Sequence, residues 1–172
     1  MSDVAFKPVY LVDAYSDPVL VRIEGRANFQ NSACLRDFVT EMIVEGKRTF
    51  AIDFLHCTSM DSTFLGVLAG AALQLRKLEP AGSLTLVRVG PRNLELIRNL
   101  GLHRLLTVDS GDFPMSFHPH HQDQALECAD RPELDTARVC LEAHENLVAA
   151  DEANRAKFQD VLVFLRNRID QR

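Results

Sequence analysis

The chain has 172 residues, of which 47% are hydrophobic and 25% charged, the balance of an ordinary globular protein. This balance excludes an intrinsically disordered chain, which lacks the apolar side chains needed to offset the entropy lost on folding. The net charge of −5 arises beyond residue 109, because residues 1–109 hold 12 basic and 12 acidic side chains. No basic patch stands out, which argues against nucleic acid as a partner.

The sequence also bears on the cellular compartment in which we expect the protein. No apolar run approaches the ~20 residues that span a bilayer, and residues 1–10 lack the apolar core of a signal peptide. We therefore expect a cytoplasmic protein with no membrane partner. In that compartment disulfides are rare, so the four widely spaced cysteines are expected to be free, half-buried thiols. They are Cys34, Cys57, Cys128 and Cys140.

Short apolar runs alternate with longer helical patterns as far as residue 109. Predicted strands cover residues 9–12, 19–23, 49–55, 84–89 and 105–108, and predicted helices cover residues 31–45, 62–78 and 91–100. The run at 49–55 is apolar almost throughout, which is typical of a central strand covered on both faces. Strands that alternate with helices predict an α/β domain over residues 1–109, with a mixed sheet of four to five strands and helices packed on it.

The pattern changes after residue 109. Residues 110–131 show little periodicity, and we interpret them as an irregular linker. Residues 132–172 predict a C-terminal helical extension, a hairpin of two amphipathic helices, with Asp130 and Glu133 as a capping box. Such helices need a surface to pack on, either the domain or a second copy of the chain, which leaves a homodimer open. The residues expected to pack are Leu141, Leu147, Phe158, Val161, Leu162 and Leu165.

The most informative stretch is the polar loop that leads from the strand at 49–55 into the second helix. Met60-Asp61-Ser62-Thr63 starts that helix, and Leu65-Gly66-Val67-Leu68 continues it. Here the chain resembles a STAS domain, the family of bacterial anti-sigma factor antagonists and of the cytoplasmic domains of sulfate transporters. The resemblance covers roughly residues 9–108. Further positions that fit its template are Gly25, Gly82 and Leu100-Gly101-Leu102.

The resemblance implies a non-catalytic regulatory protein, an anti-sigma factor antagonist in a partner-switching pathway. In that family, the anti-sigma factor is a serine kinase that phosphorylates the serine after the aspartate, and a serine phosphatase reverses the modification. The matching serine here is Ser62. A phosphate at a helix N-terminus can accept from unpaired backbone N–H groups and meets the positive end of the helix dipole. The alternative is that Asp61, Ser62 and Thr63 only cap the helix.

Two departures from the family pattern bear on partner binding, which we assign to Asn28, Phe29, Asp61, Thr63 and Phe64. Phe64 stands where the family usually has a small residue, so it either narrows kinase access or anchors the partner. Asn28 and Phe29 stand where the family often has an acidic residue. They either belong to an altered partner surface, or Asn28 caps a turn and Phe29 packs inward.

Other candidate sites carry weaker signals. His56, Cys57 and Asp61 are the candidates for catalysis, but they match no catalytic motif, so we expect no enzyme. His144, on the apolar face of a predicted helix, is interpreted as a partly buried helix residue. A histidine cluster in the linker is close enough in sequence for a metal, but no cysteine lies at zinc-finger spacing, so we assign no metal and no cofactor. Its members are His118, His120 and His121.

The function therefore has an alternative from another class. The same fold could serve as a STAS-type small-molecule sensor, or as a scaffold and dimerisation module, without any phosphorylation. Modification of Ser62 by a partner kinase separates these two classes, because a sensor or scaffold does not require it.

Overall fold

The computed structural model describes residues 8–109 and 123–171. The strands are β1 (Tyr10–Asp13), β2 (Val19–Ala27), β3 (Thr49–Met60), β4 (Ser83–Val87), β5 (Thr107–Val108) and β6 (Gln124–Ala125). The helices are α1 (Ser32–Val44), α2 (Ser62–Arg76), α3 (Pro91–Asn99), α4 (Glu133–Ala150) and α5 (Asn154–Asp170), with a 3₁₀ turn, η1 (Leu102–Arg104).

The strands form one mixed sheet in the order β5-β4-β3-β2-β1-β6. Strands β2 to β5 pair in parallel, whereas β1 runs antiparallel to both β2 and β6. The prediction of an α/β fold with the 49–55 strand inside the sheet is confirmed. The sheet has six strands rather than four or five, because the chain at 124–125 adds a short edge strand beside β1.

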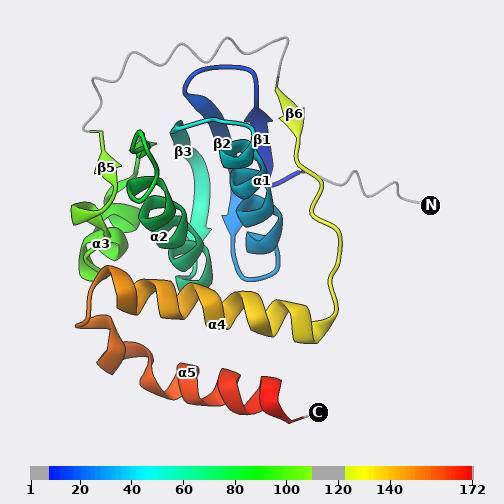
Figure 1. The fold of residues 1–172 in the computed structure, drawn as a ribbon, viewed down its shortest axis with the longest axis vertical. Helices are drawn as coiled ribbons and strands as arrows, with labels where there is room; N and C mark the ends of the chain where they lie inside the picture. The colour runs from blue at the N-terminus through cyan, green and yellow to red at the C-terminus, as the bar shows by residue number, and fades with distance from the viewer. Residues whose placement is uncertain (1–7, 110–122, 172) are drawn as a thin grey trace.

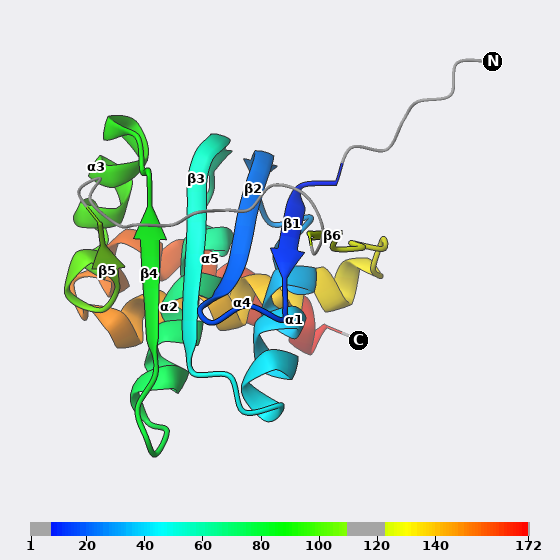
Figure 2. The ribbon, with the colours of Figure 1, turned by 90° about the horizontal axis from the view of Figure 1, so that it is seen from above.

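Helices α1, α2, α4 and α5 all lie on one side of this sheet, and α3 lies toward its β5 edge (Figure 2). The side chains beneath α1 and α2 come from alternate positions of β2 and β3, as the two-residue period of a strand requires. They are the fully or almost fully buried Val19, Val21, Ile23, Phe50, Ile52 and Phe54. These side chains and the inner faces of α1 and α2 make the main core.

A buried charge lies on the other face of β3. The Asp53 side chain has no exposed surface, and it accepts a hydrogen bond of 2.9 Å from Nε of Arg88. The Nε atom of Arg22 lies 3.8 Å from the same carboxylate. Pairing with two guanidinium groups offsets the cost of burying the carboxylate, so this site is explained by the stability of the sheet.

The C-terminal extension packs on the domain as a helical pair (Figure 1). The predicted hairpin is present, but the predicted capping box is not. Helix α4 begins at Glu133 with Pro132 as its N-cap, so Asp130 and Glu133 do not occupy the N-cap and N3 positions that a capping box needs. The Glu133 carboxylate binds Arg168 of α5. Of the residues expected to pack, Leu147, Leu162 and Leu165 are buried, Leu141 and Phe158 are half-buried, and Val161 is 39% exposed.

Helix α4 approaches α2 most closely at two glycines. A methyl group at Gly66 would overlap the backbone carbonyl of Ala143, and one at Gly70 would overlap the side chain of Asn146. Nδ2 of Asn146 also donates a hydrogen bond of 3.3 Å to the Gly66 carbonyl. The absence of side chains on this face of α2 therefore fixes how α4 sits.

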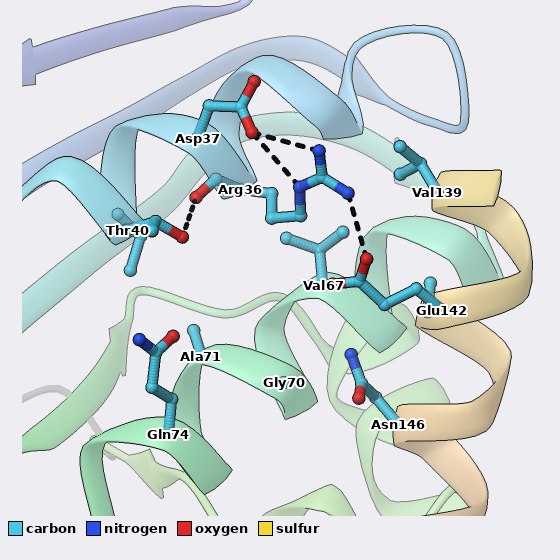
Figure 3. Close-up of a pocket in the computed structure, with 12 residues that line it drawn as sticks. Arg36, Asp37, Thr40, Val67, Gly70, Ala71, Gln74, Val139, Glu142 and Asn146 are labelled. Carbon is cyan, nitrogen blue, oxygen red and sulfur yellow. Dashed lines mark hydrogen bonds and ion pairs between the residues drawn. The ribbon is translucent and has the colours of Figure 1, made fainter. Parts of the chain in front are cut away.

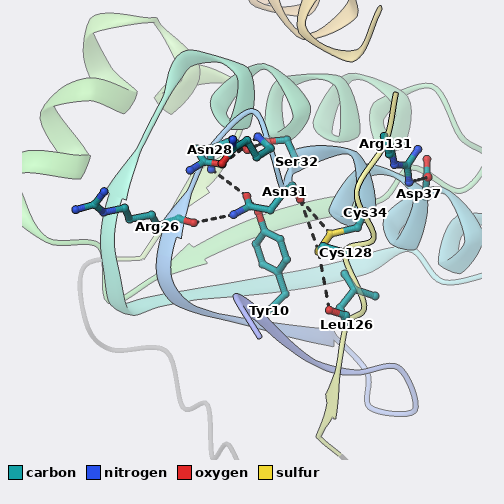
Figure 4. Close-up of a disulfide and its surroundings, with 11 residues drawn as sticks. Tyr10, Arg26, Asn28, Asn31, Ser32, Cys34, Asp37, Leu126, Cys128 and Arg131 are labelled. Atoms are coloured by element: carbon teal, nitrogen blue, oxygen red, sulfur yellow. Dashed lines mark hydrogen bonds and ion pairs between the residues drawn. A yellow bond between two sulfur atoms is a disulfide. The ribbon is translucent and has the colours of Figure 1, made fainter. Parts of the chain in front are cut away.

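Two further connections hold the extension in place. Nδ2 of the buried Asn154 donates to the carbonyls of Leu100 and Leu147, at 2.9 and 2.8 Å, and so joins the α4–α5 turn to the end of α3. A disulfide between Cys34 and Cys128, with Cα atoms 5.2 Å apart, joins α1 to the segment after β6 (Figure 4).

The disulfide corrects the expectation of four free thiols, which holds only for Cys57 and Cys140. The backbone N–H of Leu126 donates to the Tyr10 carbonyl, at 2.9 Å. This bond brings the chain after β6 back along the domain, close to α1. The two bonded cysteines are 94 residues apart, so their spacing gave no sign of the pairing.

The two glycines of α2 make a matched pair of substitutions. We expect Gly66→Ala to lower the free energy of unfolding by about 1–3 kcal/mol, because the backbone of α4 must shift to admit the methyl group. Gly70→Ala should be close to neutral. The helix-propensity gain of about 1 kcal/mol offsets a displaced Asn146 side chain that can rotate away. Urea unfolding followed by circular dichroism measures both, and equal losses would contradict this account of the contact.

Candidate functional site

The predicted phosphoacceptor region surrounds the start of α2, where β3 ends. Asp61 is the N-cap residue, and its carboxylate accepts from the backbone N–H of Phe64 at 2.9 Å. The other carboxylate oxygen accepts from the backbone N–H of Phe29 at 2.7 Å. Asp61 therefore both caps α2 and ties to it the loop that precedes α1.

The loop before α1 carries Asn28 and Phe29, the two predicted partner-binding residues that stand where the family often has an acidic residue. Oδ1 of Asn28 accepts from the backbone N–H of Gln30 at 2.9 Å, so Asn28 caps a turn. The Phe29 side chain is 46% exposed and does not pack inward. The structure thus brings Asn28, Phe29 and Asp61 together around one end of α2.

Phe64 and Thr63 lie beneath this surface. Phe64 has no exposed area, and its ring centroid lies 6.5 Å from that of Tyr10 and 6.3 Å from that of Phe54. Thr63 is 4% exposed, with its hydroxyl 3.6 Å from Sγ of Cys140. The interpretation of Phe64 as a partner-facing anchor is therefore corrected, because its position in the first turn of α2 points it into the core.

Ser62, the first residue of α2, is half-buried rather than open to solvent. Its Oγ lies 2.9 Å from Nε2 of His144, a residue of α4 that is 4% exposed. The other ring nitrogen, Nδ1, lies 2.7 Å from the carbonyl oxygen of Cys140. The imidazole ring also packs against the ring of Phe158 in a T-shaped arrangement, with centroids 5.0 Å apart. The C-terminal extension therefore contacts the predicted phosphoacceptor directly.

His144 was missed as a site residue. Its sequence position shows only a polar side chain on the apolar face of a helix, which is usually a satisfied core residue. A second signal was the pair of glycines four residues apart in α2, which indicates that another helix packs closely there. Together the two signals suggest which helix face meets α2, but not which atom of α2 the imidazole reaches.

Two hollows lie beside Ser62. One, of about 430 Å³, lies between α2, α3 and α5, and Leu96, Lys157 and Phe158 help to line it. The other, of about 520 Å³, has Asp61 and His144 among its polar residues. Its apolar residues are Phe29, Val161, Phe164 and Leu165.

A third hollow, of about 350 Å³, lies between α1, α2 and α4, away from Ser62 (Figure 3). Arg36 crosses it, donating from one guanidinium to Glu142 at 3.1 Å and to Asp37 at 3.1 Å. The pair with Glu142 links α1 to α4, whereas the pair with Asp37 lies within α1, and exposed ion pairs of this kind contribute little stability each. The hollow is explained by the way three helices meet.

The residues considered for catalysis are poorly arranged for it. Burial raises the pKa of the Cys57 thiol to about 11, so the thiol is protonated at neutral pH. Its Sγ lies 3.4 Å from the carbonyl oxygen of Ser59, while His56 is exposed. The carboxylate of Asp61 is held by backbone N–H groups. The histidine cluster at 118–121 lies outside the described residues.

Comparisons with known proteins bear on the fold of residues 11–107. The family model described as "Mlab, STAS domain" matches residues 11–107. No curated protein matches the chain. In the described parts of the chain, no helix combines the length and apolar character needed to cross a membrane.

Several solved structures are similar in fold. An anti-sigma factor antagonist from Mycobacterium paratuberculosis is 19% identical, with a TM-score of 0.52 over 62% of this chain and 88% of that one. SpoIIAA of Bacillus in its phosphorylated form is also 19% identical, with a TM-score of 0.49 over 59% and 91%. The first of these likenesses supports the fold, and both matches leave much of the present chain uncovered.

The dual role of Asp61 yields a prediction. Asp61→Ala removes both acceptor oxygens and should lower the free energy of unfolding by about 1–2 kcal/mol. Asp61→Asn keeps one acceptor oxygen for the Phe64 N–H but none for the Phe29 N–H, so it should lose less. Hydrogen exchange should then show faster exchange at the Phe29 amide in both variants and at the Phe64 amide only in Asp61→Ala. An unchanged Phe29 amide in both would contradict the tie.

Proposed function

The chain belongs to the STAS domain family, and we propose that it is a non-catalytic regulatory binding protein, an anti-sigma factor antagonist controlled by phosphorylation of Ser62. The observation that carries this proposal is the position of Ser62 as the first residue of α2, half-exposed and beside Asp61. The proposed partners are an anti-sigma factor serine kinase and a serine phosphatase.

The start of α2 suits a phosphate chemically. The first backbone N–H groups of a helix point out of its N-terminus, where the helix dipole also favours negative charge. Lys157 lines one of the hollows that Ser62 lines, where its ammonium donates to the Asn99 carbonyl. A phosphate would add about −1.5 to −2 charges without any need to refold the domain. The added charge would therefore alter how a partner binds at this surface.

The partner-binding surface that we propose includes parts of two regions. Asn28 and Phe29 contribute from the loop held by Asp61, and Phe29 is exposed there. Helix α5 contributes exposed apolar side chains at Val161 and Phe164, which line the same hollow as Phe29. A kinase that reaches Ser62 would contact the C-terminal extension as well as the STAS unit.

The switch is tested by substitutions at Ser62. We expect Ser62→Ala to bind the kinase constitutively and to lose about 1 kcal/mol of stability, through the bond to His144. Ser62→Asp should bind more weakly, because it forces a fixed negative charge into an interface formed with the unmodified serine. Ser59→Ala, at an exposed serine of β3, is the control and should behave as wild type. Calorimetry measures affinity, and circular dichroism confirms folding.

The small-molecule sensor is the second candidate, favoured by the two partly apolar hollows beside Ser62. Incubation with the partner kinase and ATP, followed by mass spectrometry, distinguishes the two. A phosphate on Ser62 supports the switch. Equal affinities of wild type, Ser62→Ala and Ser62→Asp for the kinase, without any phosphate, would favour the sensor.

A homodimer through the C-terminal helices forms a separate part of the proposal. Helix α5 exposes Val163, which is 51% accessible and is not among the residues that line the hollow shared with Phe29. We expect the wild type to sediment as a dimer and Val163→Glu to sediment as a monomer, because burying a charge opposes association. Val44→Glu is the control, since Val44 on α1 is 81% exposed and lies outside the extension. A monomeric wild type would contradict this part of the proposal.

A further inference from the structure

The hydrogen bonds of His144 determine how its ring faces Ser62. Nδ1 lies 2.7 Å from the Cys140 carbonyl oxygen, which can only accept, so Nδ1 carries a proton. In the neutral imidazole Nε2 then has a free lone pair, and it lies 2.9 Å from Oγ of Ser62. The Ser62 hydroxyl therefore donates to the imidazole. A serine that donates to a histidine whose other nitrogen is held by a fixed acceptor has the arrangement of a nucleophile and its base.

We propose that His144 is the general base that accepts the proton of Ser62 during phosphoryl transfer. This inference rests on the proposed function, because the partner kinase supplies the phosphoryl donor, a nucleoside triphosphate. A lone pair of Ser62 Oγ forms a bond to the γ-phosphorus while the hydroxyl proton passes to Nε2 of His144. The bond from that phosphorus to the bridging oxygen breaks, and a nucleoside diphosphate leaves. The imidazolium then returns its proton to water.

The imidazole is held firmly enough for this role. His144 is 4% exposed, and the ring of Phe158 lies against it at a centroid distance of 5.0 Å. One turn of α4 carries both the histidine and the carbonyl that orients it. The backbone of Ala143, the residue before His144, seats against Gly66 of α2. A base held in place in this way needs no rearrangement before it accepts a proton.

Ser62 remains reachable while it is bonded to His144. It lines both hollows, of about 430 and 520 Å³, so an electrophile has space beside the hydroxyl. Besides His144, the ionisable groups of these hollows are Asp61 from the α2 N-cap, Cys140 from α4, and Lys157 and Asp160 from α5. Burial raises the pKa of the Cys140 thiol, so it stays protonated beside the site.

The test uses the full chain and a probe that needs no kinase. A fluorophosphonate phosphonylates serines that have a base, releasing fluoride, and mass spectrometry locates the adduct. We expect wild type to be labelled at Ser62 and His144→Gln to be labelled about 100-fold more slowly, within the usual range for a general base. His103→Gln, at an exposed histidine of η1, is the matched control and should react as wild type. Ser59, an exposed serine, reports reaction due to accessibility alone.

Two further readouts separate a base from a merely structural histidine. Wild type should show a pH-dependent labelling rate that His144→Gln lacks. In His144→Ala, added imidazole should restore labelling at Ser62. Equal rates for wild type and His144→Gln, or no labelling of Ser62 in wild type, would overturn the inference.

The outcomes also separate this inference from the proposed function. If a kinase phosphorylates Ser62 equally fast in wild type and His144→Gln, the switch stands and His144 is not its base. If the probe labels Ser62 in a His144-dependent way but no kinase modifies it, the activated serine stands and the partner switch fails.

Discussion

The close approach of α4 to α2 is the constraint on which the candidate site depends. Gly66 presents no side chain, so the backbone of Ala143 can lie against it. The two helices run in the same direction past this contact. Cys140 lies at Thr63, on its N-terminal side, and Asn146 lies at Gly70, on its C-terminal side. His144 follows Ala143, and its side chain reaches back toward Cys140, one turn nearer the N-terminus of α4, where it meets the hydroxyl of Ser62. A larger residue at position 66 would move the imidazole away from the serine.

Charge distribution gives the same region a second property. The whole net negative charge of the chain comes from residues 110–172, which hold 12 acidic and 7 basic side chains. The described part of that acidic segment includes α4 and α5, next to the serine whose phosphorylation we propose. This excess does not extend to α5, which holds four basic and two acidic side chains. A phosphate would add about −1.5 to −2 charges beside α5 and would act through close contacts at Ser62.

Most elements of the fold could be predicted from the sequence because they depend on local patterns. The apolar run at 49–55 and the stripe of α2 are two such patterns. Strand β6 has only two residues, and it exists because β1 offers an unpaired edge. The burial of Phe64 had a signal that was overlooked: it lies four residues before Leu68, on the same helix face. The contact between Ser62 and His144 joins residues 82 apart, and no local pattern encodes such a pair.

The site therefore has two origins within one chain. The STAS family match ends at residue 107, and it includes the helix start that carries Asp61 and Ser62. The imidazole that contacts Ser62 comes from α4, beyond that match. The helix start alone offers a serine that is weakly nucleophilic, as any free hydroxyl is. If His144 is the base that we propose, the reactivity of Ser62 depends on how α4 packs against α2, so changes at Gly66 or Ala143 should alter it.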